Sequence, residues 1–148
     1  LILMIVTWLT FLNFNNKLDG RANEVSLMIS QVEFDDRYAE NMLRQLVKKT
    51  LLEIPKGRIE ADFNDFFKIN AQKVFELSSM DNLVISGNFF GQIRNDQFTR
   101  QSEGNVYELT IRDVFVDYQK GNNVMKRQFD LTVIFNEEGV ISSDKVYK

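Results

Sequence analysis

Three groups of carboxylates stand close together in the sequence: Glu33, Asp35 and Asp36; Asp62 and Asp65; and Glu137 and Glu138. Convergent carboxylates can bind a divalent cation or serve as the acid and the base of a hydrolytic reaction. None of these groups has the spacing of a calcium-binding loop, and neighbouring residues such as Asp35 and Asp36 project about 100° apart on a helix. We therefore expect solvated helix faces, helix caps and a turn at these positions, with no metal site.

Two serines and a lysine are the remaining candidates for covalent catalysis. The chain has no His and no Cys, so the commonest general base and the thiolate nucleophile are both absent. Strand alternation places Ser143 and Lys145, but not Ser142, on one face, as a Ser-Lys dyad requires. We expect this C-terminal segment to be exposed to solvent. No glycine-rich phosphate loop occurs elsewhere in the sequence. The sequence therefore predicts a protein that is not an enzyme and has no cofactor.

Phenylalanines are the other candidates for a binding site. Five of them occur in two short segments: Phe63, Phe66 and Phe67, then Phe89 and Phe90. They could line a small-ligand pocket between a helix and a sheet, but aromatic side chains more often fill a core. We expect core packing here. An anchored small-ligand-binding domain stays open as a third alternative for the function.

Length and charge limit the function further. The chain of 148 residues is long enough for one domain with a full hydrophobic core. Its net charge of −3 and its pI of about 5.1 are not those of a nucleic-acid-binding protein, so no nucleic-acid partner is expected. What remains is a protein that binds other proteins, a membrane or a small ligand.

Residues 1–12 are apolar except for two threonines. A helix of this length rises about 18 Å, less than the roughly 30 Å of a bilayer core. We expect either a processed or trimmed membrane helix or a helix end buried among partner helices; a core element of a soluble protein is the alternative. The residues expected at this membrane or assembly contact are Leu1, Ile2, Leu3, Met4, Ile5, Val6, Trp8, Leu9, Phe11 and Leu12.

Helical patterns follow this apolar start. Residues 13–20 are rich in Asn and contain Asp-Gly, which indicates a polar break; the predicted division is therefore 1–20, a membrane or filament-core segment, and 21–148, an extracytoplasmic domain. Residues 23–53 have the 3.6-residue period of a long amphipathic helix, with Asn23 as its cap and Asp36 interrupting its apolar stripe. A second helix is expected over residues 62–77. Possible helix-packing contacts are Val25, Met28, Ile29 and Val32.

The rest of the chain has strand patterns. Alternating apolar residues predict strands over residues 83–93, 106–118, 129–135 and 140–147, joined by turns rich in Gly and Asn. The alternation changes phase near Arg112, where a β-bulge would let both halves of the strand face the core. Helices followed by strands predict an α+β fold: an apolar N-terminal helix, a long amphipathic helix, a second short helix and a roughly four-stranded antiparallel sheet.

This layout resembles that of type IV pilins and pseudopilins. The apolar start at residues 1–12, the helical stretch that ends before Pro55, the connection over residues 56–80 and the strands that follow match that family in outline. Ile5 stands where many bacterial pilins carry a glutamate, and the apolar tract is shorter than theirs. The resemblance implies a structural subunit that packs its N-terminal helix against other copies of itself in an extracellular filament.

A second resemblance is to the periplasmic scaffold subunits of type IV secretion and conjugation machines. These have one transmembrane helix and a domain like nuclear transport factor 2, in which helices precede a curved antiparallel sheet. Residues 1–12 would then be the end of the span, and residues 62–77 would cover the sheet. This resemblance implies a membrane-anchored, non-enzymatic oligomer whose partners are other subunits of a membrane complex.

Overall fold

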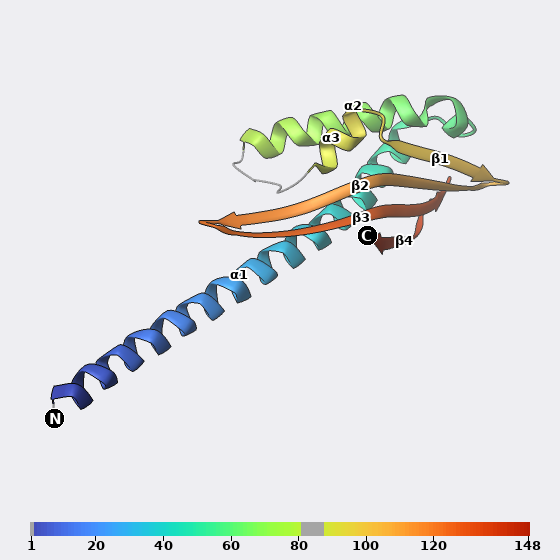
Figure 1. The fold of residues 1–148 in the computed structure, drawn as a ribbon. Helices are drawn as coiled ribbons and strands as arrows, with labels where there is room; N and C mark the ends of the chain where they lie inside the picture. The colour runs from blue at the N-terminus through green and yellow to red at the C-terminus, as the bar shows by residue number, and fades with distance from the viewer. Residues whose placement is uncertain (1, 81–87) are drawn as a thin grey trace.

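The computed structural model describes residues 2–80 and 88–148, and within them all side chains except those of residues 2–6, 8, 15, 18–19, 24, 30–35, 78–80 and 118. One long helix, α1 (Ile2–Glu53), extends well beyond the remaining elements (Figure 1). It is followed by α2 (Ile59–Met80), α3 (Phe89–Arg94) and the strands β1 (Phe98–Glu103), β2 (Val106–Lys120), β3 (Asn123–Asn136) and β4 (Gly139–Tyr147). The predicted α+β class is confirmed.

The strands form one antiparallel sheet in the order β1-β2-β3-β4, so each strand pairs with its sequence neighbour. The predicted bulge is confirmed: the register of β2 against β3 shifts between Ile111 and Val114. Asp113 adopts a left-handed backbone there, with φ 53°. The shift lets Leu109 and Ile111 before it, and Val114 and Val116 after it, all reach the core.

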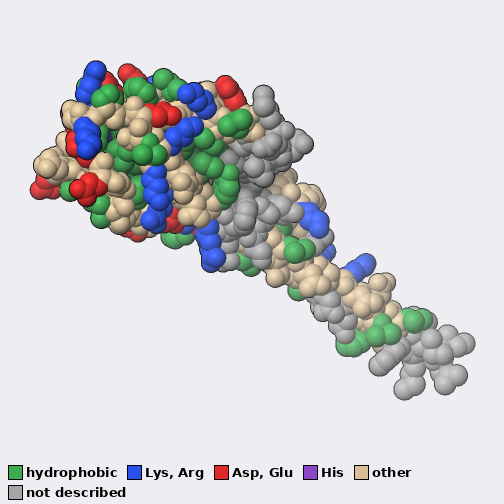
Figure 2. Space-filling view, turned by 180° about the vertical axis from the view of Figure 1, so that it is seen from behind, with side chains coloured by type: hydrophobic (Ala, Val, Ile, Leu, Met, Phe, Trp, Pro, Cys, Tyr) green, Lys and Arg blue, Asp and Glu red, His purple; other side chains and the backbone are tan. Residues whose placement is uncertain are grey.

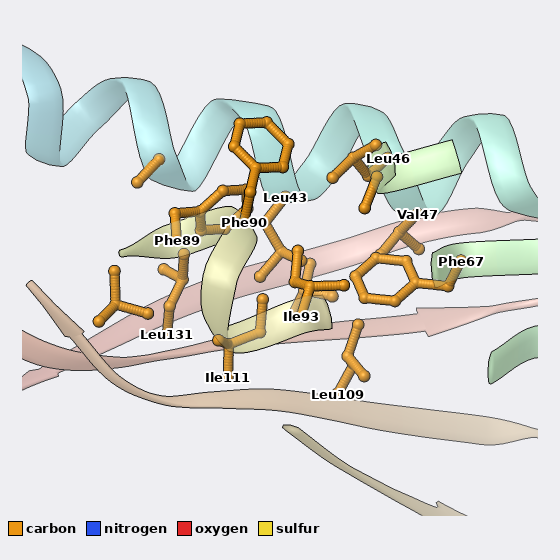
Figure 3. Packing of buried hydrophobic residues seen from close by; sticks show 14 of the residues in the cluster. Leu43, Leu46, Val47, Phe67, Phe89, Phe90, Ile93, Leu109, Ile111 and Leu131 are labelled. Carbon is orange, nitrogen blue, oxygen red and sulfur yellow. The ribbon is translucent and has the colours of Figure 1, made fainter. Parts of the chain in front are cut away.

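The core lies between one face of the sheet and the helices. α1 contributes Leu43, Leu46 and Val47, which lie close to the side chains of α2, α3 and the sheet (Figure 3). The other core residues labelled in that view are Phe67, Phe89, Phe90, Ile93, Leu109, Ile111 and Leu131. Of the five phenylalanines considered as a pocket, four are buried and Phe66 is partly buried against them, so the expected core packing is confirmed.

The predicted polar break at residues 13–20 is wrong. α1 runs through these residues as one continuous helix, and Asn23 therefore lies inside the helix and not at its start. Asn and Asp cost only about 0.7 kcal/mol each in a helix, and Gly about 1 kcal/mol. The only proline of the chain is Pro55, so nothing in residues 13–20 prevents the backbone hydrogen bonds of a helix.

The helix ends near Pro55 are predicted more accurately. α1 ends at Glu53, and Gly57 has a left-handed backbone with φ 79° in the connection to α2. α2 begins three residues earlier than expected and extends to Met80. Its buried face includes Phe63 and Phe67, as predicted, whereas Leu77 near its end is exposed.

The first predicted strand is wrong. Its second half forms the helix α3, and residues 83–87 lie outside the described part of the chain. Asn88, just before α3, attaches this helix to the bulge: its Nδ2 donates to the Asp113 carbonyl at 2.9 Å, and its Oδ1 accepts from the Phe115 N–H at 2.8 Å. The strand that pairs with β2 at that edge is β1, which was not predicted.

Candidate assembly surface and the contact at its base

The N-terminal part of α1, residues 2–27, carries large apolar side chains that are exposed to solvent. It extends away from the head, by which we mean α2, α3, the sheet and the part of α1 from Asp36 to Glu53 (Figure 1). Large apolar side chains on it lie open to solvent: Leu9 is 59 % exposed, Phe11 56 %, Phe14 59 % and Leu27 63 %. Hydrophobic side chains are visible along this narrow extension (Figure 2).

The predicted contact residues of the apolar start are described only in part. Leu9, Phe11 and Leu12 are exposed on α1. Leu1 lies outside the described residues. Six further residues belong to α1, but their side chains lie outside the described part: Ile2, Leu3, Met4, Ile5, Val6 and Trp8. Three of the predicted contact residues are therefore exposed and available to a partner.

The four predicted helix-packing contacts do not behave alike. Met28 is buried, as expected for a packing contact. Val25 is 43 % exposed and Ile29 40 %, so both are only partly covered within the chain. The side chain of Val32 lies outside the described part. Within that part, no helix combines the length and the apolar character that crossing a membrane requires.

Asp36 marks the point at which α1 meets the edge of the sheet. Its side chain is almost fully buried, although the sequence indicated a solvated position. Its Oδ1 accepts a hydrogen bond from Lys145 Nζ at 2.6 Å, and its Oδ2 accepts one from the Tyr147 hydroxyl at 2.8 Å. Arg127 Nη1 lies 3.4 Å from the same Oδ2. These donors compensate for the removal of the carboxylate from water.

Glu40 and Arg44 continue this contact along α1. Glu40 Oε1 accepts a hydrogen bond from Ser143 Oγ at 2.6 Å, and Glu40 Oε2 lies 3.1 Å from Lys145 Nζ. Arg44 Nη1 donates to Ser143 Oγ at 3.4 Å. We call the whole group the clasp: Asp36, Glu40 and Arg44 on α1, Arg127 on β3, and Ser143, Lys145 and Tyr147 on β4.

The spacing of the clasp follows from the geometry of the two elements. Residues four apart on a helix are about 6 Å apart along its axis. Alternate residues of an antiparallel strand are about 6.8 Å apart and point to the same face. The three positions of α1 and the three of β4 therefore stay opposite one another over the whole contact.

The clasp shifts the pKa of three of its groups. Hydrogen bonds from Ser143 and then Lys145 hold the pKa of the Glu40 carboxyl below its ordinary value of 4.5, although burial opposes this. Burial acts to lower the pKa of the Lys145 ammonium, but hydrogen bonds to Asp36 and Glu40 outweigh it and raise that pKa above 10.5. Burial, together with the hydrogen bond to Asp36, raises the pKa of the Tyr147 hydroxyl.

This geometry does not suit Ser143 and Lys145 as a catalytic dyad. Both lie on the same face of β4, as predicted, but they pack against α1, so the expected exposed tail is wrong for them. The Ser143 hydroxyl donates to Glu40. The raised pKa keeps Lys145 as an ammonium ion, which cannot accept a proton from a nucleophile.

The other carboxylates of the three groups do not converge on one site, and Asp65 is exposed on α2. Asp62 pairs with Arg58 at 2.9 Å at the start of α2, and the exposed Glu137 and Glu138 lie in the β3–β4 turn. The side chains of Glu33 and Asp35 lie outside the described part. Among the described residues, no group of three or more carboxylates is placed to hold a metal ion.

Comparisons with protein-family models, with curated proteins and with solved structures give no match to this chain. The surface of α1 and the clasp are therefore interpreted from their own chemistry. Sequence reasoning identified the apolar start but missed the clasp. Its one local signal was Asp36, a carboxylate in the middle of an otherwise apolar helix face.

Proposed function

We propose that this chain is a non-enzymatic structural subunit of an extracellular or membrane-associated assembly, and that it is a filament subunit of the type IV pilin kind. The observation that carries the proposal is the set of large apolar side chains exposed on α1 beyond the head (Figure 2). Burying one such side chain is worth about 1.5–3 kcal/mol. Exposed apolar patches of this kind mark sites of contact with proteins or membranes.

The arrangement of the elements supports the same function. α1 passes without interruption from the apolar residues at its start to the part that packs on the antiparallel sheet. A subunit of this form can bury its N-terminal part among identical helices while its head stays at the surface. Such end-to-side contacts do not close on themselves, and they generate a helical filament.

The experiment that tests this proposal is negative-stain electron microscopy of the full chain after removal of detergent. We expect filaments from the wild type and none from Phe11→Asp. A carboxylate at this position would have to lose its hydration when the helices pack together in the filament. Asn13→Asp is the matched control. It introduces the same charge two residues away at an exposed polar position, and it should interfere less with assembly.

Circular dichroism must show that the head of each variant melts at the wild-type temperature. Filaments formed by Phe11→Asp as readily as by the wild type would contradict the proposal. Closed particles or membrane-bound oligomers in place of wild-type filaments would favour the membrane-anchored scaffold.

A further inference from the structure

The apolar face of α1 that packs on the sheet nearly repeats every four residues. Ala39, Leu43 and Val47 follow one another at this spacing, and all three are buried. If α1 slid by one turn toward its N-terminal end, Leu43 would take the place of Ala39 and Val47 the place of Leu43. Cores tolerate such apolar exchanges, and they lose a unique arrangement before they lose stability. This row of apolar side chains alone therefore distinguishes poorly between these two alignments.

The clasp does not repeat in this way. The same slide would put Glu40 in the place of Asp36 and Arg44 in the place of Glu40. Arg44 would then face the ammonium of Lys145, which Glu40 contacts at 3.1 Å in the observed alignment. Like charges brought together at a partly buried contact repel strongly, and the two carboxylates would no longer share one lysine.

We propose that the clasp is a register lock. The clasp residues of α1 are acidic, acidic and basic in order, and they face Tyr147, Lys145 and Ser143 of β4. This match of charges selects one alignment of the helix against the sheet. It thereby sets how far residues 2–27 extend from the head. Buried ionic groups are weak sources of net stability, and fixing an alignment is their best-attested use. The inference does not depend on the proposed function, because it concerns the folded subunit alone.

The test uses two spin labels, which the absence of cysteine in the chain makes straightforward. Arg21→Cys on α1 and Ser142→Cys on β4 are both exposed positions. The distance between the labels is measured by double electron–electron resonance on the full chain in detergent. A slide of α1 by four residues, just over one turn, would move the first label by about 6 Å along the helix.

The variant that removes the lock is Asp36→Leu with Lys145→Met. The Tyr147 side chain is exposed enough, and Arg127 is open enough, for water to replace their bonds to Asp36. We expect this variant to fold with a melting temperature near that of the wild type. We also expect a second population of distances, displaced by up to about 6 Å, in place of one narrow distribution.

The matched control is Arg58→Met with Asp62→Leu, which removes an exposed ion pair at the start of α2 and should leave one distribution. One narrow distribution at the wild-type distance in the folded Asp36→Leu, Lys145→Met variant would overturn the proposal. If that variant does not fold, Asp36→Asn with Lys145→Met, which keeps an acceptor for Tyr147, is measured by the same criterion. Failure of both to fold would also overturn it, since the clasp would then be needed for stability itself.

Discussion

The carboxylate of Asp36 and the ammonium of Lys145 are 109 residues apart in the sequence and 2.6 Å apart in the structure. One belongs to the long helix α1 and the other to β4, the last strand of the sheet. Removing two charges from water costs free energy that their attraction only partly offsets, whereas removing one partner leaves the other buried without compensation. This asymmetry determines how substitutions at the two positions will differ.

Lys145→Met should destabilise the head strongly. Asp36 keeps Tyr147 and Arg127 as donors but loses its closest partner, and we expect a loss of about 3 kcal/mol in the free energy of unfolding, measured with urea. Lys68→Met is the control, because Lys68 pairs with an exposed Asp96 at 2.7 Å. Lys68→Met should lower the free energy of unfolding by less than about 1 kcal/mol. Equal losses in the two variants would contradict the role assigned to Lys145.

Glu40 should make stability depend on pH in the acid range. The pKa of Glu40 is lower in the folded protein than the ordinary 4.5. The ionised side chain therefore contributes fully to stability above pH 4.5, and this contribution is lost as the pH falls through the folded-state pKa. Glu40→Gln lacks this contribution. The difference in unfolding free energy between wild type and variant should therefore be larger near pH 7 than near pH 3, as urea titrations at the two values would measure. A difference that stays constant would exclude this linkage.

Phe135→Ala should leave a cavity in the centre of the core. The Phe135 ring is buried between Phe63, with ring centroids 4.8 Å apart, and Tyr107, with centroids 5.4 Å apart. We expect a loss of about 3–5 kcal/mol in the free energy of unfolding. Leu52→Ala, at an exposed position, should change it by no more than about 0.5 kcal/mol. A loss at Phe135 no larger than that at Leu52 would contradict the buried position of the Phe135 ring.

Gly121 should be hard to replace in the β2–β3 hairpin. It is the first central residue of a two-residue turn and has φ 60°, a backbone that side chains with a branched Cβ rarely adopt. We expect Gly121→Val to cost about 1–2 kcal/mol. Gly121→Asn should cost less, because Asn tolerates this conformation. Thermal unfolding of both variants measures the difference, and an equal effect would show that the turn can change its type.

The features of the fold that were predicted correctly have strong local signals. The phase change in β2 was visible because Leu109 and Ile111 alternate with one parity and Val114 and Val116 with the other. The strand expected around Phe89 failed because Phe89, Phe90 and Ile93 also fit one face of a helix, and short apolar segments do not distinguish the two. β1 was missed because its six residues are largely polar and half-exposed to exposed, with no alternation to read.

The clasp could not be predicted from the sequence for a different reason. Asp36 reads as a surface residue unless Lys145 is known to lie opposite it, and that contact depends on the order of the strands and on the path of α1. The exposed surface of α1 was predictable because Leu9, Phe11 and Leu12 belong to a segment that is apolar except for two threonines. Local composition therefore indicated the surface proposed for assembly, whereas its attachment to the head depends on long-range geometry.

The clasp also has a mechanical consequence. Asp36, Glu40 and Arg44 face β4 along the axis of α1, so a pull on the N-terminal end of that helix loads their contacts together, in shear. A force perpendicular to the helix axis would instead break these contacts one after another. The contact between α1 and β4 therefore resists force best along the direction in which α1 extends, which is the direction of tension in the proposed filament.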